Sequence, residues 1–457
     1  MVTVASTLPG AARRRRSDGD GVWIVSVVVI VNAVVLIGMW LRHGQLQADV
    51  GPGGLATGVG QLSALAGSYL CLFGLLLSAR VPWLERALGF GHLLVWHRWT
   101  GFAALWLLVA HVCFTTVGYA QGSGVSLWAQ TDDFVRHYPD VLMAFVGIGL
   151  LIAVGVTSAR LARRRLPRES WYAVHLYAYL AVALGFAHQL AVGSDFTDDA
   201  IARAWWAALY VAVLSAILVC RVGIPVAFNL RHRLRVATVH VEAPGVVSIW
   251  ITGRDIPAIA ARPGQFFLWR TLDRQGWWRP IPLSLSAPPG SSHLRVTVKA
   301  LGDDTTRLQR VRPGTPMFAE GPLGAFTPDR RRGESVLLIA GGIGITPLRA
   351  MLDDLAAGAG DVVVLYRVAA APDAALWKEL AAANELPNVT ARLLVGPEIG
   401  NDETDRLGIP ALRAEVPDLA GRDVYVCGPV AMIDAVVPRL RNLGVPPQRI
   451  HLERFEY

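Results

Sequence analysis

The sequence predicts three parts in order: an all-α bundle of six membrane-spanning helices, a small antiparallel β-barrel, and an α/β doubly wound parallel sheet. Of the 457 residues, 53% are hydrophobic and 17% are charged. This balance is too apolar for a soluble chain of this length and too charged for one embedded in a membrane throughout. The apolar residues crowd into roughly the first 225 positions, so we expect a membrane half followed by a soluble half.

The membrane half contains six apolar segments, each close to the ~20 residues that cross a hydrocarbon core. They cover residues 22–41, 59–79, 93–118, 140–160, 171–192 and 203–224. The first is longer than the apolar core of a cleaved signal peptide, so we expect it to be retained. Arginines cluster at 13–16, 160–168 and 221–235, whereas the opposite loops are acidic. This asymmetry predicts a multi-pass protein of the cell membrane with both termini in the cytoplasm.

The net charge of +8 does not indicate a nucleic-acid-binding protein, because the arginines stand beside apolar spans where membrane topology explains them. The four cysteines share no metal-binding spacing. They are Cys71, Cys113, Cys220 and Cys427. The composition therefore predicts a lipid-embedded protein without a zinc site or a disulfide framework.

Two histidine pairs lie within the apolar spans, His97 with His111 on the third and His175 with His188 on the fifth. Ionisable residues inside a membrane are functional candidates, although a single one can simply be satisfied by a polar neighbour. The spacings of 14 and 13 residues correspond to ~21 and ~20 Å along a helix. Two parallel helices therefore offer one pair at each of two depths. Neutral imidazole is a ligand for haem iron, whereas zinc needs ligands that converge on one point.

The two spacings differ in the helix face that they select. At ~100° of rotation per residue, two side chains 14 residues apart point within ~40° of each other around the helix axis, whereas two side chains 13 residues apart differ by ~140°. The fifth span therefore either distorts, near Gly185, or holds its two haems on different sides.

The soluble half opens with short alternating segments between residues 233 and 301. The four clearest read RLRVATVHVEA, VVSIWITG, GQFFLWRTL and HLRVTVKAL. Their period and turn residues predict an antiparallel barrel. A Gly302-Asp303-Asp304 turn then precedes Thr305 and Thr306 at an expected helix start, where free backbone N–H groups suit a pyrophosphate.

Residues 335–457 alternate apolar strands with helices, which predicts a doubly wound parallel sheet. The run SVLLIAGGIGITPLRAML is a buried strand, a glycine-rich turn and a helix. Thr346 is expected to cap that helix, with Pro347 at its first position. Gly341, Gly342 and Gly344 allow a phosphate to approach the backbone. The further strands DVVVLYRV and DVYVCGP carry Arg367 and Cys427 near their ends.

These patterns resemble a known family. HRWTG followed by a second histidine, with a His-x12-His pair two spans later, is similar to the ferric reductase and NADPH oxidase superfamily. The motifs EGPLGAF, AGGIGITP, CGP and ERFEY, in this order, resemble the ferredoxin-reductase module. The resemblance implies a cytoplasmic tail (1–20), a di-haem domain (21–226), an FAD-binding barrel (227–330) and an NAD(P)H-binding domain (331–457).

The resemblance also implies which residues hold the cofactors. His97 and His175 would ligate a haem b on the cytoplasmic side, and His111 and His188 an outer one. The residues expected at FAD are Arg279, Pro282, Leu283, Ser284, Val298, Lys299, Gly302, Thr305, Thr306 and Tyr457. Those expected at the nicotinamide nucleotide are Gly341, Gly342, Gly344, Ile345, Thr346, Pro347, Arg367, Cys427, Gly428, Pro429 and Phe455.

Three of these assignments carry alternatives. Either Tyr457 or Phe455 covers the flavin ring. Arg367 either binds a 2′-phosphate, which favours NADPH over NADH, or is only a charge at a strand end. The family usually has a basic residue, Pro, an aromatic residue and then Ser or Thr where this chain has Ile281-Pro282-Leu283-Ser284. Leu283 cannot stack on the isoalloxazine, so we expect weaker retention of FAD, with Arg279 substituting for the missing charge.

The function expected from these features is electron transfer from NADPH through FAD and two haems to an acceptor outside. Flavin is required because nicotinamide gives two electrons together and haem accepts one. The first candidate acceptor is O₂, giving superoxide or peroxide. The alternatives are a ferric or cupric chelate, and an extracytoplasmic partner protein. The loop at 119–139 is expected to shape the acceptor's entrance, but its sequence selects neither the acceptor nor an oligomeric state.

Overall fold

The structure is a computed structural model of the 457-residue chain. It describes residues 18–42, 51–88, 90–159, 162, 165–166, 168–290, 292–358, 360–396 and 405–455. Residues 13–16 and Tyr457, for which the sequence carries expectations, lie outside these ranges. The chain divides into two compact units, Met1–Arg221 and Val222–Tyr457, and each is described by itself below.

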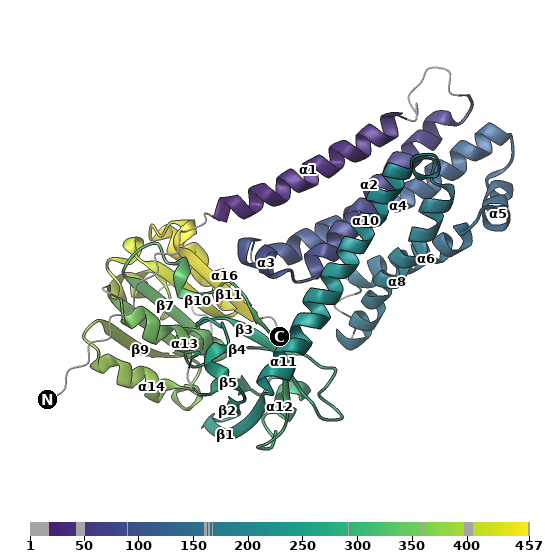
Figure 1. The fold of residues 1–457 in the computed structure, drawn as a ribbon. Helices are drawn as coiled ribbons and strands as arrows, with labels where there is room; N and C mark the ends of the chain where they lie inside the picture. Colours follow the sequence, from purple (N-terminus) through teal and green to yellow (C-terminus); the bar gives the residue numbers. More distant parts are fainter. Residues whose placement is uncertain are drawn as a thin grey trace, which may run out of the picture. The chain divides into compact units, whose positions relative to one another are not determined.

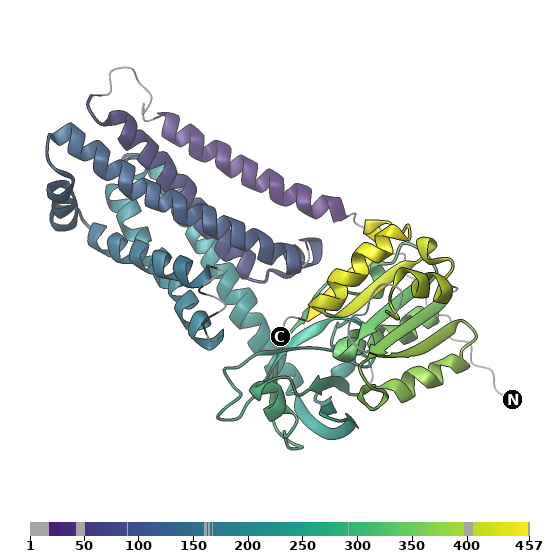
Figure 2. The ribbon, with the colours of Figure 1, turned by 180° about the vertical axis from the view of Figure 1, so that it is seen from behind.

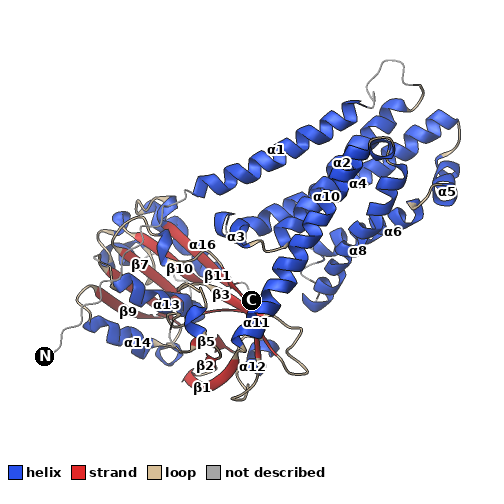
Figure 3. Ribbon diagram, viewed as in Figure 1, coloured by secondary structure: helices blue, strands red, loops and turns tan. Residues whose placement is uncertain are grey.

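The first unit is entirely helical in its described part (Figures 1 and 3). Six helices are long and apolar enough to cross a membrane, as the sequence predicts. The third is longer than expected, because it extends beyond 93–118 at both ends. The elements are α1 (Asp18–Arg42), α2 (Gly54–Ser78), α3 (Pro82–Leu88), α4 (Phe90–Ser123), α5 (Leu127–His137), α6 (Val141–Ser158), α8 (Arg168–Val192), α9 (Ser194–Thr197) and α10 (Ala200–Ile217).

The outer surfaces of these helices are apolar, the reverse of the pattern in a soluble protein. On α4, Trp99, Phe102 and Trp106 are 66%, 59% and 59% exposed. Their spacing of three and four residues places them on one face of the helix. An aromatic face that protein atoms leave mostly uncovered is suited to lipid, because hydrocarbon replaces the protein core as the apolar surroundings. The chain is therefore a multi-pass membrane protein.

The sixth span changes its winding at its end. α10 passes into a π-helical turn, Leu218–Gly223, and then into α11 (Ile224–His232). Pro225 lies in the first turn of α11 and has no backbone N–H, so the preceding turn lacks one donor. Inserted π turns of this kind accommodate such a local mismatch. Within the first unit, the Arg221 guanidinium donates to the carbonyl of Ser78 at 3.0 Å.

The second unit begins with two three-stranded antiparallel sheets, ordered β1-β2-β5 and β4-β3-β6. The four predicted strands are present, whereas β4 and β6 were not predicted. Isolated bridges at Arg235–Pro316 and Leu285–Val296 connect the sheets; closure into a complete barrel stays a prediction. The elements are β1 (Arg235–Ala243), β2 (Val246–Thr252), β3 (Phe266–Thr271), β4 (Ile281–Ser284), β5 (Leu294–Lys299), α12 (Asp303–Leu308) and β6 (Met317–Leu323).

The rest of the second unit is a five-stranded sheet of order β11-β10-β7-β8-β9, parallel throughout as the sequence predicts. Helices α13 and α14 pack on one face, and α15 and α16 on the other (Figures 1 and 2). The elements are β7 (Val336–Gly341), α13 (Ile345–Ala356), β8 (Val362–Val368), α14 (Trp377–Ala382), β9 (Val389–Val395), α15 (Ile409–Glu415), β10 (Asp423–Pro429), α16 (Val430–Asn442) and β11 (Ile450–Phe455).

The strand order locates the expected ligand crevice. The chain runs from β7 outward to β8 and β9, and then returns to β10 on the other side of β7. In open parallel sheets, ligands bind beyond the carboxyl ends of the strands at such a reversal. The reversal here lies between β7, which ends at Gly341, and β10, which ends at Pro429.

Candidate functional site

The four membrane histidines come together as two pairs between α4 and α8. The ring centres of His97 and His175 lie 6.0 Å apart, and those of His111 and His188 lie 6.4 Å apart. A metal–imidazole bond of about 2.1 Å puts two ring centres on opposite sides of one metal about 6 Å apart. Each pair therefore has the separation that a single iron between two imidazoles requires.

Helix α2 orients both histidines of α4. Nδ1 of His97 donates to the carbonyl of Gly74 at 2.9 Å, and Nδ1 of His111 donates to the carbonyl of Gly60 at 3.0 Å. A carbonyl can only accept, so these bonds fix the proton on Nδ1 and leave Nε2 as the nitrogen available to a metal. The two acceptors are separated by the same 14 positions as the two histidines.

Glycines make this arrangement possible, because they bring the backbone of α2 close to α4. A Cβ at Gly60 would lie 2.5 Å from Thr115 Oγ1, and one at Gly67 would lie 2.9 Å from Leu108 Cγ. Gly53 similarly faces Gly118. Small residues at regular intervals are the usual means of close helix packing in membranes. The spacing of seven from Gly53 to Gly74 is a signal of this contact that is visible in the sequence.

The histidines of α8 are held less firmly. Nδ1 of His175 is 3.4 Å from Ser158 Oγ, and Nδ1 of His188 is buried without a well-formed hydrogen bond. α8 is helical without interruption from Arg168 to Val192, with no break at Gly185. Both α8 histidines nevertheless lie close to a histidine of α4, with ring centres 6.0 and 6.4 Å apart.

A cavity of about 220 Å³ adjoins His111 and His188. Tyr119, Phe134 and Tyr138 line part of it and pack on one another with ring centres 5.1 to 6.3 Å apart. Phe134 belongs to α5, within the 119–139 segment that was expected to shape an entrance. In the part of the chain that the structure describes, no group of three or more His, Cys, Asp or Glu side chains could hold a metal ion without haem.

The glycine-rich turn and the CGP motif meet at the reversal of the parallel sheet. A Cβ at Gly344 would lie 2.2 Å from the Cys427 carbonyl oxygen, and one at Gly428 would lie 3.1 Å from Gly341 Cα. Gly342 adopts a φ of +53°, which disfavours other residues. Side chains are therefore excluded where a dinucleotide would approach.

The start of α13 corrects one expectation. The helix begins at Ile345, so Thr346 and Pro347 occupy its second and third positions rather than the cap and the first position. The Thr346 hydroxyl donates to the Ile343 carbonyl at 3.1 Å instead of accepting from the helix. Proline is tolerated here because N–H groups throughout the first turn have no intrahelical acceptor.

Cys427 is fully buried, and burial raises the pKa of its thiol well above the ordinary value. Its register partner on β11 is Glu453, which the sequence reasoning did not single out. Burial raises the pKa of the Glu453 carboxyl to about 7. Phe455 pairs with Pro429 two residues further on. The second candidate for covering the flavin, Tyr457, lies outside the described residues.

Arg367 is 7% exposed and lies at the end of β8. Its Nη1 is 3.7 Å from Asp405 Oδ1, while Arg439 Nη1 is 2.6 Å from Asp405 Oδ2. Burial raises the pKa of Asp405, but the Leu407 N–H and the two guanidinium groups outweigh it and keep the pKa below the ordinary value. Two cations therefore share one carboxylate beside the expected nucleotide crevice.

The expected flavin residues fall on β4, β5 and α12. Ser284 is buried and pairs with Phe266, while Leu283 is half-buried. Arg279 Nη1 donates to Asp304 Oδ1 at 2.9 Å, which joins the segment before β4 to α12. The Val298 side chain is 1% exposed and belongs to the core.

The turn before α12 also differs from expectation, because the helix begins at Asp303 rather than at the threonines. Thr305 Oγ1 accepts from the N–H groups of Leu301 and Gly302 at 3.0 and 3.1 Å. These two donors are thus already used within the turn. The N–H groups that remain for a pyrophosphate are those within the first turn of α12 itself.

Comparison with known protein families finds one match in each half of the chain. Residues 63–186 match the family described as ferric reductase like transmembrane component. Residues 338–437 match the family described as oxidoreductase NAD-binding domain. The first match includes His97, His111 and His175 but ends before His188. The second includes the glycine-rich turn and the CGP motif.

Several curated proteins resemble part of the chain. A flavohemoprotein of Bordetella pertussis is 31% identical over 42% of this chain and 52% of its own length. NADH oxidoreductase HCR of Escherichia coli is 30% identical over 49% and 67%. The ferredoxin reductase component of the 3-ketosteroid-9-alpha-monooxygenase of Mycolicibacterium smegmatis is 33% identical over 49% and 65%. The chain spans about half the length of the flavohemoproteins that it matches.

Among solved structures, the FAD/NAD-binding domain of the nitric oxide dioxygenase from Vibrio cholerae is 25% identical, with a TM-score of 0.40. The similarity covers 49% of this chain and 99% of that domain. The assignment of the fold rests on the strand order described above and not on this similarity.

Proposed function

Because the chain joins a ferric-reductase-like transmembrane component to an FAD- and NAD(P)H-binding reductase module, we propose that it is a transmembrane oxidoreductase. It would pass electrons from cytoplasmic NADPH, through FAD and two haem b groups, to an acceptor at the outer face of the cell membrane. The observation that supports this most directly is the pair of ring separations, 6.0 and 6.4 Å, between α4 and α8. Haem supplies one-electron chemistry when bound, and flavin converts hydride into single electrons.

The membrane residues have separable roles in this proposal. His97 and His175 would ligate one haem, and His111 and His188 the other. The carbonyls of Gly74 and Gly60 hold the α4 imidazoles in the tautomer that a metal requires, and outer-shell bonds of this kind also raise ligand basicity. Two bonded imidazoles leave no open position on the iron, so the acceptor would react at the haem edge.

In the soluble half, the excluded side chains at Gly344 and Gly428 support dinucleotide binding at the switch point of the sheet. Ser284 would place its hydroxyl near the flavin, with Arg279 and the first turn of α12 near the phosphates. Leu283 offers apolar contact without stacking. FAD is therefore proposed to bind more weakly than in relatives with an aromatic residue at this position.

The outer haem would occupy the cavity beside His111 and His188, and the aromatic part of its lining supports O₂ as the acceptor. Aromatic side chains of α4, α5 and the following turn form part of its lining, and such side chains suit a small apolar molecule better than a bulky charged chelate. The alternative, a ferric or cupric chelate reductase, is favoured by the acidic residues Asp132 and Asp133 on α5. Electron transfer to an extracytoplasmic partner protein is the second alternative.

One experiment separates these acceptors. The purified chain is supplied with FAD and NADPH, and cytochrome c reduction sensitive to superoxide dismutase is compared with anaerobic formation of a ferrous chelate. If O₂ is the acceptor, we expect cytochrome c reduction that superoxide dismutase inhibits, and little anaerobic formation of the ferrous chelate. Strong anaerobic iron reduction without aerobic superoxide would instead identify a chelate reductase.

The ligand assignment is tested independently of the acceptor. The protein is expected to show a b-type spectrum with about two haems per chain. His111→Leu should reduce that number to about one while FAD reduction by NADPH continues. An unchanged haem content in this variant would show that the assignment is wrong.

A further inference from the structure

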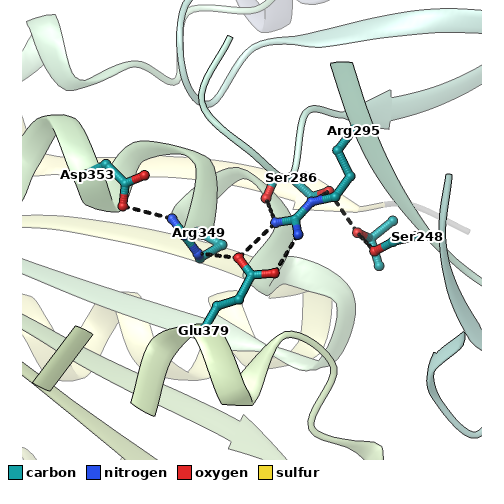
Figure 4. Close-up of polar contacts among 7 residues, drawn as sticks. Ser248, Ser286, Arg295, Arg349, Asp353 and Glu379 are labelled. Atoms are coloured by element: carbon teal, nitrogen blue, oxygen red, sulfur yellow. Dashed lines mark hydrogen bonds and ion pairs between the residues drawn. The ribbon is translucent and has the colours of Figure 1, made fainter. Parts of the chain in front are cut away.

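One polar cluster in the second unit joins the flavin-side sheets to the nucleotide-binding half, and nothing in the proposed function uses it (Figure 4). Its centre is Arg295 of β5, whose side chain is 5% exposed. A guanidinium withdrawn from water requires partners for its charge and its donors. The partners of Arg295 come from both halves of the unit.

On the flavin side, Arg295 is bound to the segment that directly follows β4. Its Nε donates to Ser286 Oγ at 3.1 Å, and its Nη2 donates to the Ser286 carbonyl. The Ser286 N–H donates back to the Arg295 carbonyl at 2.8 Å. Thr297 Oγ1 donates to Ser286 Oγ at 2.7 Å, and Ser248 Oγ lies 2.8 Å from Thr297 Oγ1. Strand β4, which ends at Ser284, is therefore fixed relative to Arg295.

On the nucleotide side, one carboxylate connects three elements. Glu379 of α14 accepts from Arg295 Nη1 through Oε1 and from Arg295 Nη2 through Oε2, the latter at 3.0 Å. Its Oε2 also accepts from Arg349 Nε of α13 at 2.7 Å. Arg349 Nη1 reaches Asp353 at 2.9 Å along its own helix. Bidentate pairs of this kind fix orientation as well as distance.

The electrostatics agree with a stable link. Burial raises the pKa of Glu379, but the hydrogen bonds and charges of Arg295 and Arg349 outweigh it and hold the pKa below the ordinary value. The Glu379 carboxylate is therefore ionised at neutral pH. It forms an ion pair with Arg295 and a second one with Arg349. Because α13 begins at the glycine-rich turn, the cluster links strand β4 to that turn.

We propose that the Arg295–Glu379–Arg349 cluster is a positioning device that sets the spacing between strand β4 and the glycine-rich turn, and hence between the flavin and the nicotinamide. This inference rests on the proposed transfer of hydride from NADPH to FAD. Such a transfer depends steeply on distance, since displacements of about 1 Å can cost about 100-fold in rate. None of the three residues needs to touch either cofactor.

The test uses the full-length protein loaded with FAD. Glu379→Gln keeps the size of the side chain and removes its charge, and flavin reduction by NADPH is followed anaerobically by stopped flow. We expect the limiting rate to fall by about 10-fold or more, with the KM for NADPH changed less than about 3-fold. Glu415→Gln is the matched control, because Glu415 pairs with Arg392 on α15 and β9, away from the cluster. A wild-type limiting rate in Glu379→Gln would overturn the proposal.

A structural measurement separates this inference from the proposed function. Hydrogen–deuterium exchange should increase in Glu379→Gln at both 281–299 and 345–356, with FAD absent, and stay unchanged in Glu415→Gln. If Glu379→Gln fails to fold, Arg349→Met retains the buried Arg295–Glu379 pair and should still accelerate exchange at 345–356 and slow flavin reduction. Unchanged exchange overturns the positioning role. Failure of the wild-type protein to reduce FAD with NADPH would overturn the proposed function alone.

Discussion

Glu453 shows how one half-buried carboxyl makes the stability of the second unit depend on pH. Burial raises its pKa from 4.5 to about 7. Between these values the folded chain binds a proton that the unfolded chain has released. The contribution of Glu453 to stability is therefore fully present below pH 4.5 and is lost as the pH rises through about 7.

The replacement Glu453→Gln should remove this contribution, because the amide stays neutral at every pH. We expect the wild-type Tm of the second unit to fall more between about pH 5.5 and 8.5 than the Tm of the variant. Thermal unfolding at both pH values measures the difference, and Glu415→Gln should retain the wild-type dependence. Equal pH dependence in Glu453→Gln and the wild type would contradict the raised pKa.

Arg367 tests the choice of coenzyme. Arg367 and Arg439 both pair with the carboxylate of Asp405, so Arg367 is held at the end of β8, where a 2′-phosphate is proposed to bind. Arg367→Gln should lower kcat/KM for NADPH by about 10- to 100-fold, the range for hydrogen bonds to charged groups, and alter kcat/KM for NADH much less. Steady-state reduction of ferricyanide with each coenzyme measures the ratio. An equal loss with both would assign Arg367 to the structure of the sheet.

At the scale of elements, the contact of α2 with α4 is the feature with the sharpest consequence. Gly60→Ala places a methyl 2.5 Å from Thr115 Oγ1 and 2.9 Å from Thr115 N. The helices must separate, at a cost of about 1–3 kcal/mol, and the bond from His111 to the Gly60 carbonyl lengthens. We expect a changed midpoint potential for one haem only, measured by potentiometric titration of the haem absorbance.

Two further glycines serve as controls for this prediction. Gly149→Ala on α6 meets nothing within 4 Å and should behave as the wild type. Gly67→Ala also crowds α4, but its methyl meets the side chain of Leu108 rather than a histidine partner. It should lower stability without changing either potential. Equal shifts in Gly60→Ala and Gly67→Ala would show that helix separation, and not the histidine bond, is the cause.

The same elements show what the sequence could predict. The six spans and the parallel strands were predictable because each consists of a long run of one residue class. Strands β4 and β6 were not, since proline and short length hide the alternation in IPLS and MFAEGPL. The two spacings predicted one histidine pair at each of two depths, and the resemblance to the ferric reductase and NADPH oxidase superfamily implied the pairing of His97 with His175. The carbonyls of Gly60 and Gly74 carry no side-chain signal, and the Arg295–Glu379 link joins positions 84 residues apart.

At the scale of the whole molecule, the two units separate two kinds of chemistry. The second unit holds the glycine-rich turn and the flavin-side sheets, which suit two-electron transfer from a nicotinamide. The first unit holds two imidazole pairs and, among its described residues, no other group suited to a metal ion. A continuous helical segment, Ala200–His232, joins the units along the chain. In the proposed transfer, electrons pass from the second unit of the chain to the first.

This order can be tested with one variant at each histidine pair. In His111→Leu, the pair that would ligate the cytoplasmic-side haem is intact, so NADPH should still reduce the remaining haem although the acceptor receives no electrons. In His97→Leu, FAD should be reduced while the remaining haem stays oxidised, because the first carrier is missing. Anaerobic absorbance spectra of flavin and haem after addition of NADPH distinguish the two. Reduction of the remaining haem at the wild-type rate in His97→Leu would reverse the assignment of the pairs, since the first electron would then enter at His111 and His188.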